Sequence, residues 1–152
     1  LWPHLTIRQN IELPLKNLDG KQDHNYKEGL IEFFELTDFV NRYPNEASLG
    51  QRQRAAIVRA LALKPKYLLL DEVTSALDVE HVGKLLQRLK QLKEMGTAIM
   101  VVTHLIGFAS QSADRIVFIE DGMVVEANGP ELLTNPKSKR VEQFLSLIHS
   151  AH

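Results

Sequence analysis

Two adjacent carboxylates near the middle of the chain could do chemistry. Tyr67-Leu-Leu-Leu is an apolar run that ends in Asp71 and Glu72, and a second apolar run, Ile99–Val102, is followed two residues later by His104. Neighbouring strands of this kind suit nucleotide hydrolysis: one carboxylate can hold Mg²⁺, the other can accept a proton from the attacking water, and the histidine can sense the γ-phosphate. An apolar run that ends in an acid also occurs in ordinary parallel strands, where the acid caps the next helix. The acids alone therefore leave both interpretations open.

Hydrophobic periodicity and turn residues predict alternating helices and strands around these groups. Residues 2–18 are expected to form a loop with short helical pieces, residues 19–21 a turn, and Asp121-Gly122 a tight hairpin. The pattern predicts strands at residues 67–71, 98–103, 115–119 and 123–126, and helices at residues 25–36, 38–42, 50–63, 79–95, 106–112 and 139–149. This order predicts an α/β fold with a mainly parallel sheet, flanking helices and an antiparallel edge hairpin.

Composition restricts the function classes. A chain of 152 residues with 44% hydrophobic content can bury a core as one domain, and a net charge of −1 gives no electrostatic reason to expect nucleic acid as a partner. The absence of cysteine excludes disulfides, thiol catalysis and a cysteine-based zinc site, and the six histidines are scattered. No apolar run approaches about 18 residues and no signal peptide is recognisable, so we expect membrane contact only through a partner and no direct insertion.

A set of motifs in fixed order narrows the interpretation. Ala47-Ser-Leu-Gly-Gln-Arg-Gln-Arg54 leads into the helix that precedes Asp71 and Glu72, then follow Ser75-Ala-Leu-Asp78 and the strand that ends in Thr-His. This order resembles the nucleotide-binding subunits of ATP-binding cassette (ABC) transporters. The polar amino-acid uptake group is the most similar, on three further stretches: Trp2–Thr6, Leu77–Gly83 and Asp121–Glu126. The resemblance covers essentially the whole chain. It implies a partial P-loop NTPase-like (ABC) fold, with residues 1–63 as a helical subdomain that includes the signature segment and residues 64–152 as the α/β core portion with its C-terminal helix.

The resemblance also implies roles for individual residues. Asp71 would coordinate Mg²⁺, Glu72 would be the general base for the lytic water, and His104 stands at the switch-histidine position. Asp78 ends the D-loop, which crosses the dimer interface in the family. It is equally suited to cap the helix that follows, and both roles can hold at once. The other five histidines receive no role: His4, His24, His81, His149 and His152.

The signature segment departs from the family pattern Leu-Ser-Gly-Gly-Gln at two positions. Ser48, Gly50 and Gln51 match, and the resemblance implies that this helix N-terminus faces ATP held by the other subunit. Ala47 and Leu49 differ. A glycine at the Leu49 position would permit close backbone approach or positive φ, so we expect the leucine either to clash or to shift the loop. In the structural alternative, Ser48 is only the N-cap of its helix.

The chain lacks one part that nucleotide binding requires. No Gly-x-x-x-x-Gly-Lys-[Ser/Thr] segment occurs in it, so no P-loop wraps the phosphates. We expect this Walker A loop and the Q-loop glutamine to precede residue 1, as in the C-terminal portion of a longer protein or a truncated gene product. The 152-residue chain alone is accordingly expected to be inactive.

The sequence therefore predicts part of a cytoplasmic ATPase subunit, held at the inner face of the membrane by permease subunits of an importer for polar amino acids. In the family, two such subunits sandwich two ATP molecules. The transported amino acid cannot be named from these residues. Two alternatives remain. A non-transport ABC protein should carry coiled-coil insertions or basic arms, and neither is visible. A degenerate, non-hydrolysing module that binds only a partner is favoured by the missing P-loop and by Ala47 and Leu49.

Overall fold

The computed structural model describes residues 1–17 and 23–150. The predicted turn at residues 19–21 lies outside them. The chain forms two compact units, Leu1–Val102 and Thr103–His152. The predicted division into a helical subdomain, residues 1–63, and an α/β core portion, residues 64–152, stays a prediction.

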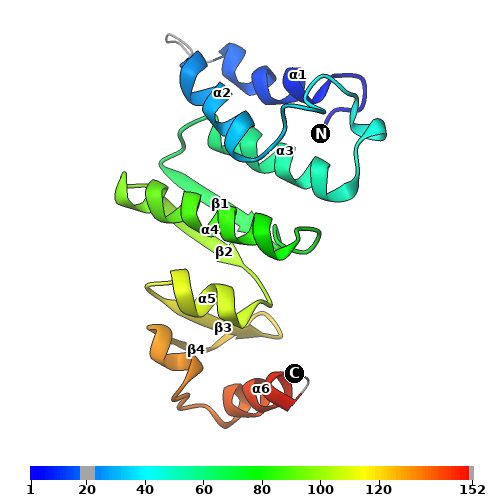
Figure 1. The fold of residues 1–152 in the computed structure, drawn as a ribbon. Helices are drawn as coiled ribbons and strands as arrows, with labels where there is room; N and C mark the ends of the chain where they lie inside the picture. Colours follow the sequence, from blue (N-terminus) through cyan, green and yellow to red (C-terminus); the bar gives the residue numbers. More distant parts are fainter. Residues whose placement is uncertain (18–22, 151–152) are drawn as a thin grey trace. The chain divides into compact units, whose positions relative to one another are not determined.

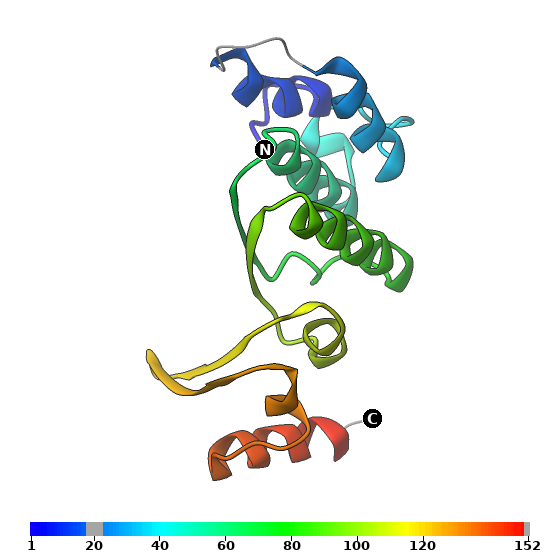
Figure 2. The ribbon, with the colours of Figure 1, turned by 90° about the vertical axis from the view of Figure 1, so that its left-hand side faces the viewer.

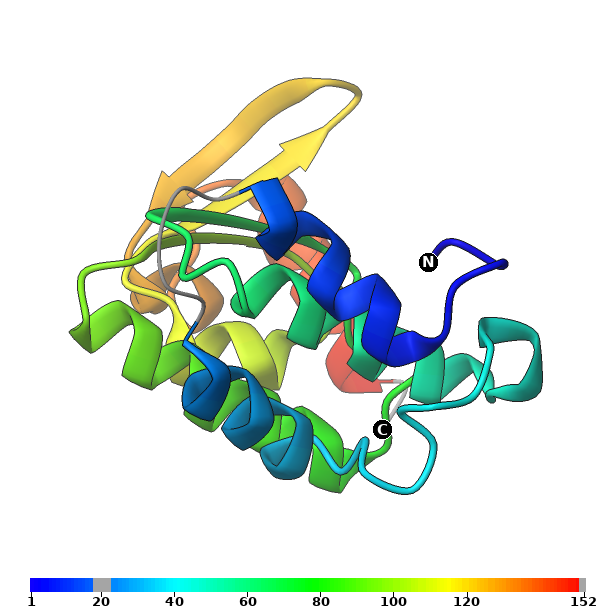
Figure 3. The same ribbon diagram turned by 90° about the horizontal axis from the view of Figure 1, so that it is seen from above.

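The first unit begins with helices that bury their apolar faces against one another. They are α1 (Ile7–Glu12), the 3₁₀ turn η1 (Leu13–Asn17), α2 (His24–Phe33), the 3₁₀ turn η2 (Pro44–Glu46) and α3 (Leu49–Leu61). Both α1 and α2 contact α3 (Figure 1 and Figure 3). The fully buried side chains at the centre include Ile7, Ile11, Leu30, Phe34, Val58 and Leu61. The helices at residues 25–36 and 50–63 were predicted from their apolar residues, and the structure buries several of these on α2 and α3, while residues 2–18 contain the short helical pieces α1 and η1.

The helix predicted at residues 38–42 is wrong. This segment consists of turns, in which the backbone N–H of Phe39 donates to Leu36 O and that of Arg42 donates to Phe39 O, each at 3.0 Å. A residue before proline is pushed toward extended conformations, and Tyr43, before Pro44, has φ −80° and ψ 155°. The segment is therefore too short to continue into an α-helix.

A parallel pair of strands forms the sheet of the first unit. Strands β1 (Tyr67–Asp71) and β2 (Ala98–Val102) pair in parallel with Tyr67 opposite Ala98, and α4 (Val79–Glu94) connects them. The helix lies against one face of the pair (Figure 2), where Leu68 and Leu70 are buried. The other face is exposed and apolar: Leu69 is 76% and Met100 57% exposed.

An antiparallel hairpin organises the second unit. It follows α5 (Ile106–Ser112) and pairs β3 (Ile116–Glu120) with β4 (Met123–Asn128). The predicted hairpin is confirmed: Asp121 and Gly122 both have positive φ, 48° and 75°, as a type I′ turn requires. The 3₁₀ turn η3 (Pro130–Leu133) and α6 (Lys139–Ser150) follow, and Leu132, Val141 and Leu145 form the core beside the hairpin.

The α/β class expected from the sequence is confirmed, with parallel pairing in the first unit and antiparallel pairing in the second. Across residues 1–17 and 23–150, no helix has both the length and the apolar character needed to cross a membrane.

The exposed face of β1 and β2 generates a prediction. Unpaired strand edges and apolar surface recruit other chains, so the chain should self-associate as its concentration rises. Leu69→Lys should weaken this association at least several-fold, as measured by sedimentation, because it places a charge on the exposed face. Lys90→Ala, at an exposed position of α4, is the control and should leave association unchanged. A monomer at high concentration in the unsubstituted chain would contradict the expectation.

Candidate active site

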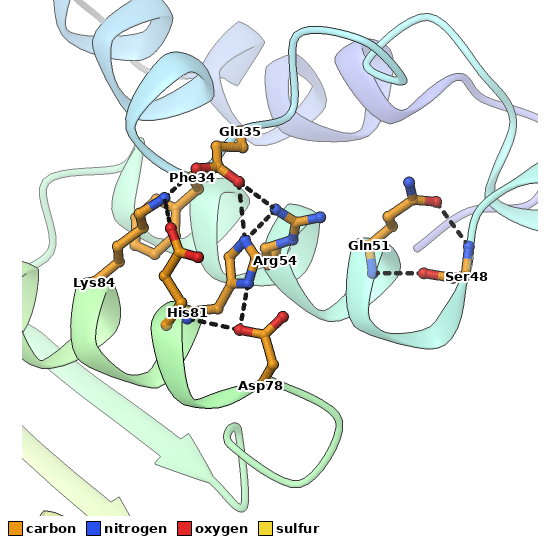
Figure 4. A network of polar contacts seen from close by, with 9 residues as sticks. Phe34, Glu35, Ser48, Gln51, Arg54, Asp78, His81 and Lys84 are labelled. Atoms are coloured by element: carbon orange, nitrogen blue, oxygen red, sulfur yellow. Dashed lines mark hydrogen bonds and ion pairs between the residues drawn. The ribbon is translucent and has the colours of Figure 1, made fainter.

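Helix α3 begins in a reciprocal capping box between Ser48 and Gln51. The Oγ of Ser48 accepts from the Gln51 backbone N–H at 3.2 Å, and Gln51 Oε1 accepts from the Ser48 backbone N–H at 2.9 Å (Figure 4). The N-cap role expected for Ser48 is confirmed. A hydroxyl that accepts a hydrogen bond still carries its own hydrogen, so Ser48 can also donate to a further group. Capping and ligand binding are therefore compatible at this residue.

Leu49 occupies the first helical position of α3 without backbone strain. It is not among the residues with positive φ, and its side chain is 63% exposed. Of the two properties that a glycine would permit at this position, positive φ is not used by the backbone, and the expected clash or shift of the loop stays a prediction. The leucine side chain lines a pocket of about 460 Å³ together with Pro44, Gln53 and Ala76. The bulk of this exposed side chain would hinder a group that approaches the start of α3.

Close packing joins α3 to the loop that follows β1. A Cβ on Gly50 would lie 2.7 Å from the backbone oxygen of Ala76, closer than real contacts allow. Gln53 spans the same loop: its Oε1 accepts from the Ala76 N–H at 3.0 Å, and its Nε2 donates to Glu72 O at 3.3 Å. Gly50 is therefore required for approach between two segments of this chain, and Gln53, which sequence reasoning missed, holds the loop that carries the acids.

The two acids lie at the C-terminal end of β1, both exposed. Glu72 has φ 44°, a left-handed conformation that costs a non-glycine residue about 1–2 kcal/mol. The backbone N–H of Glu72 donates to Val102 O at 2.9 Å, which extends the ladder between β1 and β2 by one bond and offsets part of this cost. Two residues on, the Oγ1 of Thr74 is buried and has no hydrogen-bond partner within the described residues.

Asp78 caps α4 and begins a polar network (Figure 4). The Asp78 carboxylate accepts a hydrogen bond from the backbone N–H of His81 at 2.9 Å and another from the His81 ring at 2.7 Å. These hydrogen bonds are the main cause that lowers the pKa of the Asp78 carboxyl, and the nearby positive charge of Arg54 is a smaller cause. The His81 ring also contacts Arg54 and Glu35. Sequence reasoning gave His81 no role, and its spacing of three residues from a helix N-cap was the one local signal that could have found it.

The structure brings four of the predicted site residues together. Ser48, Gly50, Gln51 and Asp78 line one pocket of about 250 Å³, with Arg54 and His81 as its further polar walls. Glu72 is linked to α3 by the hydrogen bond from Gln53 to its backbone oxygen, and Asp71 directly precedes it in the chain. His104 belongs to the second unit, where it occupies an exposed bend just before α5, and the Leu105 backbone N–H donates to the Thr103 hydroxyl at 3.0 Å.

The oxygen ligands that these residues offer suit a Mg²⁺ ion that is bound together with a nucleotide. Within the described ranges no three histidine or acidic side chains converge in a way that could hold a metal ion by themselves. Asp71 offers a single exposed carboxylate. Mg²⁺ typically takes one or two protein carboxylates and completes its shell with phosphate oxygens and water. The position of Asp71 therefore fits Mg²⁺ that arrives with a nucleotide.

Comparison with known proteins agrees with this arrangement. The ABC transporter family model matches residues 1–75. The chain is 45% identical over 152 residues to the glutamine transport ATP-binding protein GlnQ of Geobacillus stearothermophilus, with 97% of this chain and 63% of the relative covered. It is 47% identical over 153 residues to the arginine transport ATP-binding protein ArgV of Corynebacterium glutamicum, with 97% and 60% covered. The chain also resembles a solved dimeric structure of an ATP-binding cassette in a post-hydrolysis state, bound to ADP and Pi, at 35% sequence identity and a TM-score of 0.73. The matched region covers 86% of this chain and 59% of the cassette chain.

The chain is therefore similar to ATP-binding proteins of the ABC transporter family, among them the glutamine and arginine transport proteins named above. It spans 63% and 60% of the length of the two curated relatives.

The contact between Gly50 and Ala76 leads to a stability prediction. Gly50→Ala places a methyl group 2.7 Å from the Ala76 oxygen, so it should destabilise the fold by about 1–3 kcal/mol. The matched control is Gly83→Ala in α4, where a Cβ meets nothing within 4 Å; it should stabilise by about 0.5–1 kcal/mol through helix propensity. Chemical denaturation measures both changes. Equal effects of the two substitutions would refute the packing role of Gly50.

Proposed function

We propose that residues 1–152 are part of the ATP-binding and ATP-hydrolysing subunit of an ABC importer for polar amino acids. One observation carries the proposal. The capped start of α3, with Ser48 and Gly50, and the acid-bearing end of β1 are tied to the same loop by the Gly50 contact with Ala76 and by the two hydrogen bonds of Gln53. Phosphate-binding groups and hydrolytic groups are thus held by one framework.

The residues have distinct tasks in this proposal. The Glu72 carboxylate accepts a proton from the water that attacks the γ-phosphate. Asp71 supplies a carboxylate oxygen to Mg²⁺, which would neutralise phosphate charge. The Ser48 hydroxyl donates to a phosphate oxygen while its Oγ keeps accepting from Gln51, at a helix N-terminus whose dipole favours an anion. Gln51 acts by fixing Ser48, Asp78 by shaping the pocket beside it, and His104 by hydrogen bonding to the γ-phosphate.

The partners follow from the same geometry. Ser48 and Asp78 line an open pocket at the start of α3, and in this proposal the phosphates that they contact are held by a second nucleotide-binding subunit. The dimeric cassette bound to ADP and Pi supports this arrangement. Permease subunits then place the protein at the cytoplasmic face of the membrane. The net charge of −1 gives no electrostatic reason to propose nucleic acid as a partner.

The substrate proposal stops at the class of polar amino acids. Relatives of almost equal sequence identity are named for glutamine transport and for arginine transport, so the sequence identity of this subunit does not indicate which amino acid is transported. Selection of the amino acid is therefore a property of the permease and its binding protein.

Nucleotide affinity tests the proposed dependence on a P-loop. The chain itself should bind Mg-ATP no more tightly than about 1 mM, which corresponds to roughly 4 kcal/mol, because the backbone cradle and lysine that hold the phosphates are missing from it. It should show no ATPase activity by itself. Calorimetry that returns micromolar affinity would show that the nucleotide binds elsewhere.

Hydrolysis tests the role of Glu72. In a protein where residues 1–152 follow a segment that carries a P-loop, Glu72→Gln should lower ATP hydrolysis by roughly 100-fold or more while ATP binding persists, because the amide keeps the shape but cannot accept the proton. Glu94→Gln, at the end of α4, is the control and should leave both unchanged. A non-hydrolysing module would show no activity to lose, and an active protein indifferent to Glu72→Gln would overturn the assignment.

The same protein tests the signature segment. Leu49→Gly should raise the hydrolysis rate, because removal of the exposed side chain lets a phosphate group reach the start of α3. The Ser48 and Gln51 capping box stays intact in this variant, so the helix start should persist. If turnover is unchanged while Glu72→Gln abolishes it, Leu49 does not obstruct the site.

A further inference from the structure

His81 is shared between two groups with opposite hydrogen-bonding character. Its Nε2 lies 2.5 Å from Nη1 of Arg54 on α3 and 3.2 Å from Oε2 of Glu35, just after α2. A guanidinium only donates hydrogen bonds, and a carboxylate only accepts them. One ring nitrogen cannot accept from Arg54 and donate to Glu35 at the same time. The protonation state of Nε2 therefore decides which partner it binds.

The other ring nitrogen is committed in both states. Nδ1 lies 2.7 Å from Oδ1 of Asp78, and because that carboxylate only accepts, Nδ1 carries a hydrogen throughout. Neutral His81 must then have its lone pair on Nε2, where it accepts from Arg54. Protonated His81 has hydrogen on both nitrogens, so it donates to Glu35 and repels the guanidinium, which is also positive.

Arg54 has other interaction partners nearby whether His81 is neutral or protonated. Its Nη1 also donates to Phe34 O at 3.1 Å and lies 3.6 Å from Glu35 Oε2, and its guanidinium carbon is 5.4 Å from the centre of the Phe39 ring. Release from His81 therefore leaves Arg54 with partners at the end of α2. The side chains of Arg54 and His81 are both 12% exposed, so little water is available to replace the contact that is lost.

The charged groups around His81 are nearly balanced. From the end of α2 comes Glu35, and from α3 comes Arg54. On its own helix lie Asp78, Glu80 and Lys84, and Lys84 forms ion pairs with both Glu35 and Glu80 (Figure 4). The hydrogen bond from Lys84 is the main cause that lowers the pKa of Glu35, with His81 as a smaller cause, so Glu35 stays an acceptor near neutral pH.

We propose that His81 is a proton-controlled latch between α4 and α3. When neutral, it accepts a hydrogen bond from Arg54 and fastens the Asp78 end of α4 to α3. When protonated, it releases Arg54 and binds Glu35. Arg54 and Asp78 line the same pocket as Ser48 and Gly50. On the proposed function, on which this consequence rests, acidification loosens the Asp78 loop from α3 and so regulates the site.

Nuclear magnetic resonance of the 152-residue chain, without nucleotide, tests the latch directly. Long-range ¹H–¹⁵N spectra across pH 5.5–8.5 should show neutral His81 with its hydrogen on Nδ1, although free histidine prefers Nε2. The side-chain signal of Arg54 should move with the same pH dependence as the His81 ring. His81→Gln identifies the His81 signals, and His24→Gln, at an exposed histidine outside this network, should leave the Arg54 titration unchanged. Hydrogen on Nε2 in the neutral ring, or an Arg54 signal indifferent to the titration, overturns the proposal.

Stability gives an independent readout. In a double-mutant cycle of Arg54→Met and His81→Leu, the favourable coupling should change the folding equilibrium about threefold or more at pH 8.0, and at pH 5.5 it should vanish or become unfavourable. The cycle of Glu35→Gln and His81→Leu should show the reverse dependence. Two cycles with no pH dependence contradict the latch. Neither measurement uses ATP, so a failed latch leaves the Glu72 assignment standing, and a failed Glu72→Gln test leaves the latch standing.

Discussion

Close contact between α3 and the loop after β1 is the constraint on which the candidate site depends. Only glycine fits at position 50, because the Ala76 oxygen occupies the space of a Cβ, and Gln53 hydrogen bonds to both ends of the same loop. The helix that Ser48 caps and the strand that ends in Asp71 are therefore held in a fixed arrangement by this loop. Without this contact the start of α3 and the acid-bearing end of β1 would be positioned independently.

Two glutamates near these elements have a strained, left-handed backbone. Glu35 and Glu72 both have positive φ without being glycine, 56° and 44°. Such residues persist when surrounding interactions determine them. Glu72 is held by the hydrogen bond from its backbone N–H to Val102 O, and Glu35 by the hydrogen bond from its backbone N–H to Glu32 O and by the ion pair with Lys84. These conformations place Glu72 at the exposed end of β1 and the Glu35 carboxylate beside His81.

Most elements were predictable because their signals are local. Ser48 and Asp78 act as N-caps where the sequence placed them, Pro65 follows the end of α3, and Gly96 follows the end of α4. The limits of β1 and α5 agree fully with prediction. The helix expected at residues 38–42 failed since a short apolar pattern cannot show whether the chain has room to form bonds between residues four apart before a proline.

The sequence by itself determined the order of the motifs, the acids at the end of β1, and the residues that cap α3 and α4, because each depends on neighbours within a few positions. Only the tertiary structure decided the partners of Gln53, Arg54 and His81. Gln53 and Glu72 are 19 residues apart, Arg54 and His81 are 27 apart, and His81 and Glu35 are 46 apart. No local periodicity encodes such pairs. They form because α2, α3, α4 and the loop after β1 pack together, and because the side chains of Arg54 and His81 are mostly buried, where a polar group needs a partner.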